Sequence, residues 1–114
     1  MKKTGKIDYL EMSAPGATLD AVKAFYSNAF GWTFTDYGPT YSAFDEGLEG
    51  GFEATKPDEA AKPLPVLYSQ NLEETLAAVE DAGATIVRPI FSFPGGRRFH
   101  FTDPAGNELA VWSE

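Results

Sequence analysis

The order of predicted elements in this 114-residue chain occurs twice. Residues 7–12 predict a strand, residues 19–30 a helix, and segments 32–37, 41–44 and the surroundings of Phe52 three more strands. The same order returns with a strand at 66–68, a helix at 72–82, and strands at 85–90, 97–102 and 108–113. Two copies are too few for a solenoid. The repeat therefore predicts an α+β domain of two tandem βαβββ modules.

Signals at the helix ends support both copies. Thr18 can cap the first helix, Phe25 and Phe30 are predicted on its apolar stripe, and Gly31 ends it. Asn71 precedes the second helix with Glu74 three residues later, which is a capping-box arrangement, and Gly83 follows that helix.

The chain is predicted to be a single domain, residues 1–114. Module 1 spans about 5–54 and module 2 about 66–114, and a linker rich in proline and charged residues joins them at 55–65. A hydrophobic content of 43% with 23% charged residues suits a packed core.

The charge and cysteine content exclude several classes of function. A net charge of −8 has the wrong sign for attracting nucleic acid or an anionic membrane, and it favours neutral or cationic ligands, although solubility explains it equally well. The absence of cysteine excludes disulfides, thiolate nucleophiles and zinc–thiolate clusters. The basic residues 1–6 lead into no apolar run, and no stretch is long enough to span a membrane, so a cytoplasmic protein is expected.

Two short sequence segments resemble those of one protein family. The segment 25–32, Phe-Tyr-Ser-Asn-Ala-Phe-Gly-Trp, is similar to the end of the first helix in vicinal-oxygen-chelate proteins, which include glyoxalases, bleomycin-resistance proteins and dioxygenases. The segment 101–107, Phe-Thr-Asp-Pro-Ala-Gly-Asn, is similar to the hairpin before their final strand. The resemblance implies curled mixed sheets that form a concave cleft, helices on the convex side, and often a homodimer. The enzymes of the family hold a divalent metal with His, Glu or Gln side chains, whereas the bleomycin-binding proteins lack it.

The family's metal positions are poorly matched. The last ligand of the family falls on Ala110, and the nearest carboxylate on that strand, Glu108, is displaced by two residues, or about 6.6 Å. The first ligand falls on Tyr9 or Glu11, according to the alignment chosen. The remaining positions carry Glu53, Val66 and Tyr68. The resemblance therefore implies no metal site, and no other cofactor is predicted.

The strand at 97–102 supplies the polar candidates. Alternation places Phe99 and Phe101 on one face and Arg98, His100 and Thr102 on the other. His100, the only histidine, is a candidate for acid–base catalysis with Glu11, or it only hydrogen-bonds across the sheet. Arg97 and Arg98 could clamp a carboxylate or phosphate, or they form a solvated strand end.

Aromatic side chains complete the predicted site. Trp112 lies two residues after Ala110 on the same predicted strand, so its side chain should point to the same face and into the cleft. Trp32, Phe34 and Tyr37 are expected in the core. The predicted ligand-binding residues are Tyr9, Glu11, Glu53, Arg98, His100 and Trp112. Aromatic walls with few polar groups suit a planar neutral or cationic molecule.

Three functions remain open. The first is a metal-free binding protein of the bleomycin-resistance type. The second is an enzyme, either a glyoxalase-like lyase, isomerase or dioxygenase with unusual metal ligands, or a metal-free catalyst using His100 and Glu11. The third is a structural or regulatory subunit that binds no ligand. A homodimer is expected because short curled sheets leave unpaired edges.

Overall fold

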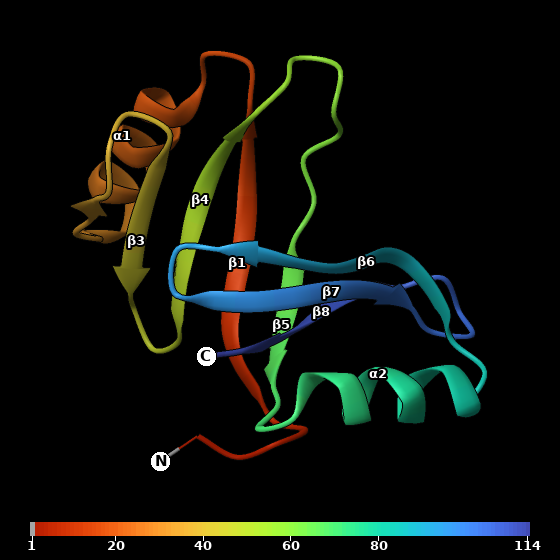
Figure 1. The fold of residues 1–114 in the computed structure, drawn as a ribbon. Coiled ribbons are helices and arrows are strands. Elements are labelled where there is room, and N and C mark those ends of the chain that lie inside the picture. The colour runs from red at the N-terminus through yellow and green to blue at the C-terminus, as the bar shows by residue number, and fades with distance from the viewer. Residues whose placement is uncertain (1) are drawn as a thin grey trace. The chain divides into compact units, whose positions relative to one another are not determined.

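The computed structural model describes residues 2–114, and in these residues the chain forms eight strands and two helices (Figure 1). The α+β class and the repeated order of one strand, one helix and three strands are confirmed. Neither helix is long and apolar enough to cross a membrane. In chain order the elements are β1 (Ile7–Pro15), α1 (Leu19–Phe30), β2 (Thr35–Asp36), β3 (Tyr41–Asp45), β4 (Glu49–Thr55), β5 (Leu64–Tyr68), α2 (Leu72–Asp81), β6 (Thr85–Phe93), β7 (Gly96–Thr102) and β8 (Glu108–Ser113).

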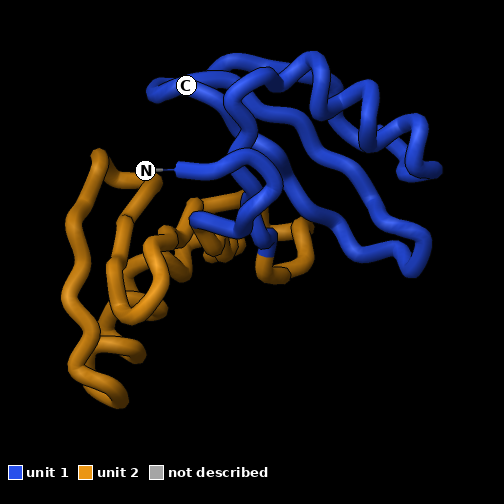
Figure 2. Tube along the Cα trace, turned by 90° about the horizontal axis from the view of Figure 1, so that it is seen from below, with its two compact units in different colours: residues 1–8, 64–114 blue, residues 9–63 orange. Residues whose placement is uncertain are grey.

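The chain separates into two compact units, which Figure 2 shows in different colours. Unit 1 comprises Met1–Asp8 together with Leu64–Glu114, and unit 2 comprises Tyr9–Pro63. Each unit has its own helix and its own group of buried apolar side chains.

Unit 2 contains the strand order β2-β3-β4-β1. Strands β2, β3 and β4 are antiparallel neighbours, and β1 runs parallel to β4. Its core joins one face of this sheet to the start of α1 through Leu19, Ala14, Phe44 and Phe52. The face of β1 that carries Met12 and Ala14 is therefore covered, and the intervening residues point to the other face.

Unit 1 repeats the arrangement with the order β5-β8-β7-β6. Strand β5 runs parallel to β8, whereas β8, β7 and β6 are antiparallel neighbours. Leu72 of α2, Phe99 of β7 and Val111 of β8 form its buried centre. Helix α2 therefore covers one face of this sheet.

The helix ends agree closely with the local sequence signals. The Asn71 side chain accepts a hydrogen bond from the backbone N–H of Glu74 at 3.1 Å, so this cap is confirmed. Gly31 ends α1 with a φ of 74°, a conformation that favours glycine. The Thr18 hydroxyl instead donates to the carbonyl of Pro15 and makes no hydrogen bond to α1.

Three expectations about unit 2 were wrong. The strand predicted at 32–37 is reduced to Thr35–Asp36, because Trp32 and Phe34 pack against the core cluster instead of alternating across a sheet. Tyr37, also expected in the core, is 66% exposed. Phe25 and Phe30, predicted on the apolar stripe of α1, are 58% and 66% exposed. Their aromatic neighbours lie on α1 itself, so the apolar stripe of α1 is wider than the part of the helix that packs against the sheet.

The segment joining the repeats is shorter than expected. Thr55 still belongs to β4, and β5 already begins at Leu64. Strand β6 extends to Phe93, three residues beyond its predicted end.

Candidate functional site

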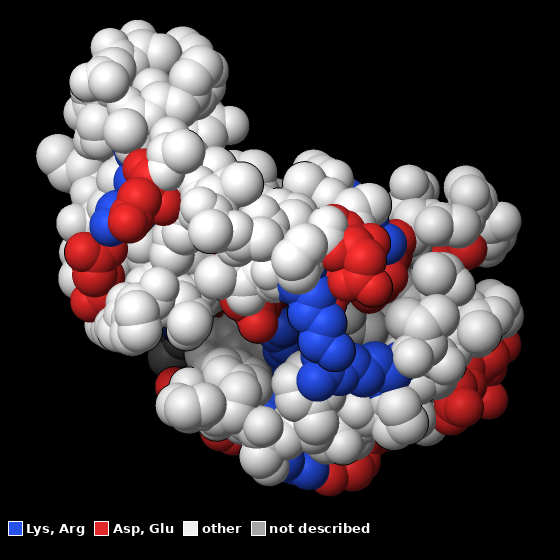
Figure 3. Space-filling view, turned by 90° about the horizontal axis from the view of Figure 1, so that it is seen from above, with Lys and Arg blue, Asp and Glu red and all other residues white. Residues whose placement is uncertain are grey.

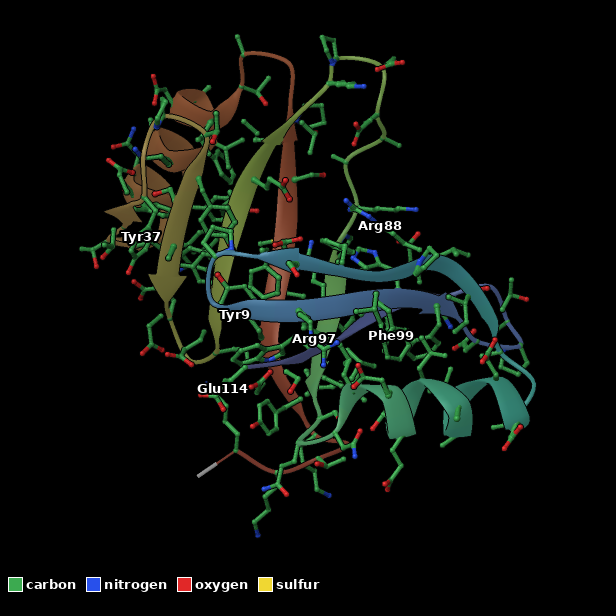
Figure 4. All side chains as sticks on the ribbon, in the orientation of Figure 1. Tyr9, Tyr37, Arg88, Arg97, Phe99 and Glu114 are labelled. Atoms are coloured by element: carbon green, nitrogen blue, oxygen red, sulfur yellow. The ribbon has the colours of Figure 1, made fainter. Side chains whose placement is uncertain are left out.

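The face of the unit 1 sheet opposite α2 carries most of the polar candidates. Phe99, which is fully buried, packs with α2, so the alternation of β7 places its neighbours Arg98 and His100 on the other face. In Figure 4 Phe99 lies between β7 and α2, and Arg88 lies on the opposite side of the sheet. Strand β8 follows the same rule, because Val111 packs under α2 and Trp112 does not.

His100 is held by a carboxylate from the neighbouring strand. Its Nδ1 lies 2.9 Å from Oε2 of Glu108, which is a diagonal neighbour across the β7–β8 pair. An ionised carboxylate can only accept, so Nδ1 carries the proton and Nε2 is left as an acceptor. His100 is 6% exposed, and its Nε2 has no hydrogen-bond partner among residues 2–114. This nitrogen is itself buried, so it is a hydrogen-bond acceptor that neither the described residues nor solvent satisfies.

The surroundings of His100 favour the neutral imidazole. Burial is the largest effect and lowers its pKa below the usual 6.5, and the charges of Arg98 and Arg88 act in the same direction. The hydrogen bond and charge of Glu108 oppose them. A neutral imidazole whose second nitrogen is fixed by a carboxylate can accept a proton at neutral pH.

Strand β6 adds residues that the sequence did not reveal. Arg88 pairs with His100, and Phe91 pairs with Arg98. A step of three residues along β6 therefore lies opposite a step of two residues along β7, and the register shifts between these pairs. The shift brings Arg88 and Phe91 to the same face, where the guanidinium carbon lies 3.7 Å from the ring centre. Strict alternation places Arg88 and Phe91, which are three residues apart, on opposite faces, so it could not predict this grouping. The only signal of an irregular strand in the sequence was Pro89, because proline is unusual within a strand.

The two consecutive arginines of β7 point to opposite sides. Both guanidinium nitrogens of Arg97 contact the Glu73 carboxylate of α2, at 2.6 and 3.0 Å. Arg98 instead stands over the rings of Phe91 and Phe93, at 5.4 and 5.6 Å. The pair therefore does not form one anion clamp, and only Arg98 lies on the same face as His100.

Trp112 lies beside Arg98 on this face, because the two residues pair across β7 and β8. Its indole N–H donates to the Asp8 carboxylate, at 3.1 and 3.3 Å from the two oxygens. Tyr68 meets the indole edge-on, with ring centres 5.3 Å apart, and Phe93 lies 6.4 Å away. Trp112 is only partly buried, so one side of this aromatic group remains accessible.

Charge is unevenly spread over the surface. In the view of Figure 3 several lysine and arginine side chains form a compact group near the centre of the face, with acidic side chains beside it. The overall charge of −8 therefore does not by itself decide which ligand charge a particular site prefers.

The remaining predicted residues belong to unit 2 and face away from its core. The hydroxyl oxygens of Tyr9 and Tyr41 lie 2.5 Å apart, and burial raises the pKa of Tyr9 although this hydrogen bond opposes the rise. Glu11 pairs with Gly51 and Ser13 with Glu53 along β1 and β4. Tyr41 also pairs with Glu53, so the two tyrosines and both glutamates share this face.

The predicted site is thus distributed over both units. Arg98, His100 and Trp112 share the face of unit 1, whereas Tyr9, Glu11 and Glu53 share the face of unit 2. Those two groupings come from the strand registers. The catalytic partnership of His100 with Glu11 stays a prediction.

Comparison with known proteins identifies the family. A family model described as Glyoxalase/Bleomycin resistance protein/Dioxygenase superfamily matches residues 6–111. Comparison with curated proteins gives no match.

Solved structures with related folds are only distantly similar in sequence. Methylmalonyl-CoA epimerase from Mycobacterium tuberculosis has a TM-score of 0.72 at 9% identity, covering 98% of this chain and 89% of its own. An NAD-dependent benzaldehyde dehydrogenase from Legionella pneumophila has 0.71 at 17%, covering 91% and 97%. The Mn(II)-bound glyoxalase from Novosphingobium aromaticivorans has 0.68 at 22%, covering 99% of this chain and 40% of that longer one. At these identities the likeness establishes the fold alone.

The donor set does not fit the metal of the family's enzymes. Among residues 2–114 no group of three or more His, Cys, Asp or Glu side chains is arranged to hold a metal ion. The position of the family's last ligand is Ala110, which is completely buried. His100 and Glu108 supply two donors, and a catalytic site needs about three protein ligands.

Proposed function

Because the chain belongs to the Glyoxalase/Bleomycin resistance protein/Dioxygenase superfamily, we propose that it binds a small planar molecule, neutral or cationic, without a metal ion. Members of this superfamily typically bind small molecules and form oligomers. The proposed binding surface includes the face of unit 1 that α2 leaves uncovered.

One observation carries the proposal: the guanidinium of Arg98 joins two groups of aromatic rings, and the second group contacts a buried imidazole whose Nε2 has no partner among residues 2–114. The rings of Tyr68, Trp112 and Phe93 follow one another at 5.3 and 6.4 Å, and Phe91 lies 5.8 Å from the imidazole of His100. Apolar surfaces with a few fixed polar groups are typical of small-molecule sites. The rings offer stacking, and a ligand that displaces the side chains covering Nε2 would donate one hydrogen bond to it, which would fix the ligand's orientation.

The test uses the fluorescence of the accessible indole. A library of small aromatic and cationic compounds is titrated against the wild type and against Trp112→Phe. Trp32 packs against the core of unit 2 and should give a constant background. Loss of stacking should weaken binding by about 0.5–1.5 kcal/mol, several-fold in affinity, and the fluorescence response should disappear. A variant that responds as the wild type does would exclude Trp112 from the site.

A second candidate function is metal-free acid–base catalysis by His100. The observation in its favour is the carboxylate-held, neutral imidazole with its free acceptor. Glu11 was predicted as its partner, and this role is part of the second proposal. Turnover that disappears in both His100→Gln and Glu11→Gln, while ligand binding persists, would favour catalysis over binding alone.

The remaining alternative, a structural or regulatory subunit, requires that no small molecule binds. We propose a homodimer for the working protein, in keeping with the oligomers common in this superfamily. A compound that shifts the Trp112 fluorescence in a saturable manner would eliminate the purely structural function.

A further inference from the structure

The side chain of a lysine lies over the indole ring of Trp112. The Lys2 ammonium lies 4.8 Å from the ring centre, within the range of a cation–π interaction. Lys2 is an exposed side chain, so it holds this position without being packed into the core. The indole face is therefore suited to a positive charge and is accessible to one from solvent.

The groups around this indole face reinforce that preference. Asp8 accepts the hydrogen bond of the indole N–H, and the Tyr68 hydroxyl donates to Glu114 at 2.8 Å. The carboxylate of Glu114 raises the pKa of Tyr68, so the phenol stays neutral and its ring remains a neutral wall. Two carboxylates thus border a group of rings from Trp112, Tyr68 and Phe93.

We propose that this group is a subsite for the ammonium group of an organic ligand, with Trp112 as its floor and Asp8 and Glu114 as its counter-charges. Aromatic walls with nearby carboxylates bind alkylated ammonium groups better than anions, since the ring faces and the acids both carry negative potential. A strongly hydrated inorganic cation gains less, because it must lose water to approach a ring. The subsite therefore selects a bulky, weakly hydrated cation.

Lys2 acts as the internal competitor for this subsite. A ligand's ammonium group must displace the lysine, so the observed affinity is reduced by the strength of the lysine's own contact. The inference rests on the proposed function, since it names the chemical group that a cationic ligand would present. It goes further in assigning that group to one place and in giving Lys2 a role in setting the affinity.

The test compares choline with 3,3-dimethylbutan-1-ol, its neutral carbon isostere, on the full chain. The readout is the indole N–H signal of Trp112 in a proton–nitrogen correlation spectrum, assigned by its loss in Trp112→Phe. Choline should shift this signal saturably, and the neutral isostere should bind at least several-fold more weakly. Equal binding of the two compounds, or no shift with either, would overturn the ammonium subsite.

Matched variants separate the lysine's role from a general loss of charge. Lys2→Met should increase the choline affinity by about two- to fivefold, the size expected for one exposed cation–π contact. Lys3→Met makes the same change of charge one residue away and should leave the affinity nearly unchanged. Asp8→Asn should weaken choline binding. Equal effects of the two lysine variants would contradict the assignment.

The outcomes also separate this inference from the proposed function. Choline has no ring, so it reports on the ammonium subsite alone. If planar neutral compounds bind while choline does not, the subsite is wrong and the binding function stands. If choline binds and planar compounds do not, the subsite stands and the binding of planar ligands is wrong.

Discussion

Glu108 holds the Nδ1 edge of His100 from the adjacent strand at 2.9 Å, and the opposite nitrogen of the ring is left without a partner within residues 2–114. The contact joins the one histidine of the chain to a carboxylate that lies too far along β8 to replace Ala110 as a family-type metal ligand. It orients the ring instead. The position that carries a metal ligand in the family's enzymes is therefore an alanine here, and its pairing partner on β7 is the imidazole that Glu108 orients.

The first prediction concerns stability below neutral pH. Burial lowers the folded-state pKa of His100 below 6.5, so the unfolded chain binds the proton more readily. The stabilising contribution is fully present above pH 6.5 and is lost as the pH falls through the lower folded-state pKa. Urea unfolding at a series of pH values should show this decline in the wild type and a smaller one in His100→Gln. An identical dependence of the free energy of unfolding on pH in the two proteins would contradict this prediction.

A second prediction uses an ion pair on the other face of the same sheet. Arg97 lowers the pKa of Glu73 from 4.5 to about 2, so this pair stabilises the fold above pH 4.5 and loses its effect as the pH falls toward about 2. Glu73→Gln should therefore reduce stability slightly at neutral pH and not at pH 2. The effect should be small and should shrink in high salt, because both side chains are solvated. If Glu73→Gln changed the free energy of unfolding only near pH 6, the effect could not be assigned to the Glu73–Arg97 pair.

The local alternation of the strands could be predicted from the sequence. Phe99 and His100 were assigned to opposite faces of β7, and Asn71 to the cap of α2, and the structure confirms both. These assignments depend on side-chain periodicity and on hydrogen bonds between residues close in sequence, which a single sequence displays directly.

Features that depend on partners distant in sequence were missed. The irregular register of β6 brings Arg88 beside Phe91, and alternation alone cannot reveal an inserted residue. Phe25 and Phe30 fit a helical period, yet the period does not show how wide a stripe the sheet covers. The grouping of Lys2 with Trp112 depends on how the chain's first residues lie against β8.

The third prediction is a homodimer. Strands β2 and β6 stand at the two ends of the described strand order, and an edge strand leaves backbone groups available for pairing. Val87 on β6 is also 47% exposed, which adds apolar surface to that edge. Light scattering should give twice the mass of one 12.4 kDa chain at micromolar concentration. A single species at the mass of one chain would count against this assembly.

The last prediction tests why β4 carries glycine at position 51. A Cβ at Gly51 would lie 2.3 Å from the Tyr41 hydroxyl and 2.5 Å from the adjoining ring carbon, so the phenol lies directly across the glycine on its way to Tyr9. Gly51→Ala must displace that ring and should lower the free energy of unfolding by about 1–3 kcal/mol, the usual cost of overpacking. In a Tyr41→Ala background the same substitution should cost much less, because the obstructing ring is absent. Urea unfolding of the four proteins measures this coupling. Equal costs in both backgrounds would show that Tyr41 does not determine the need for glycine.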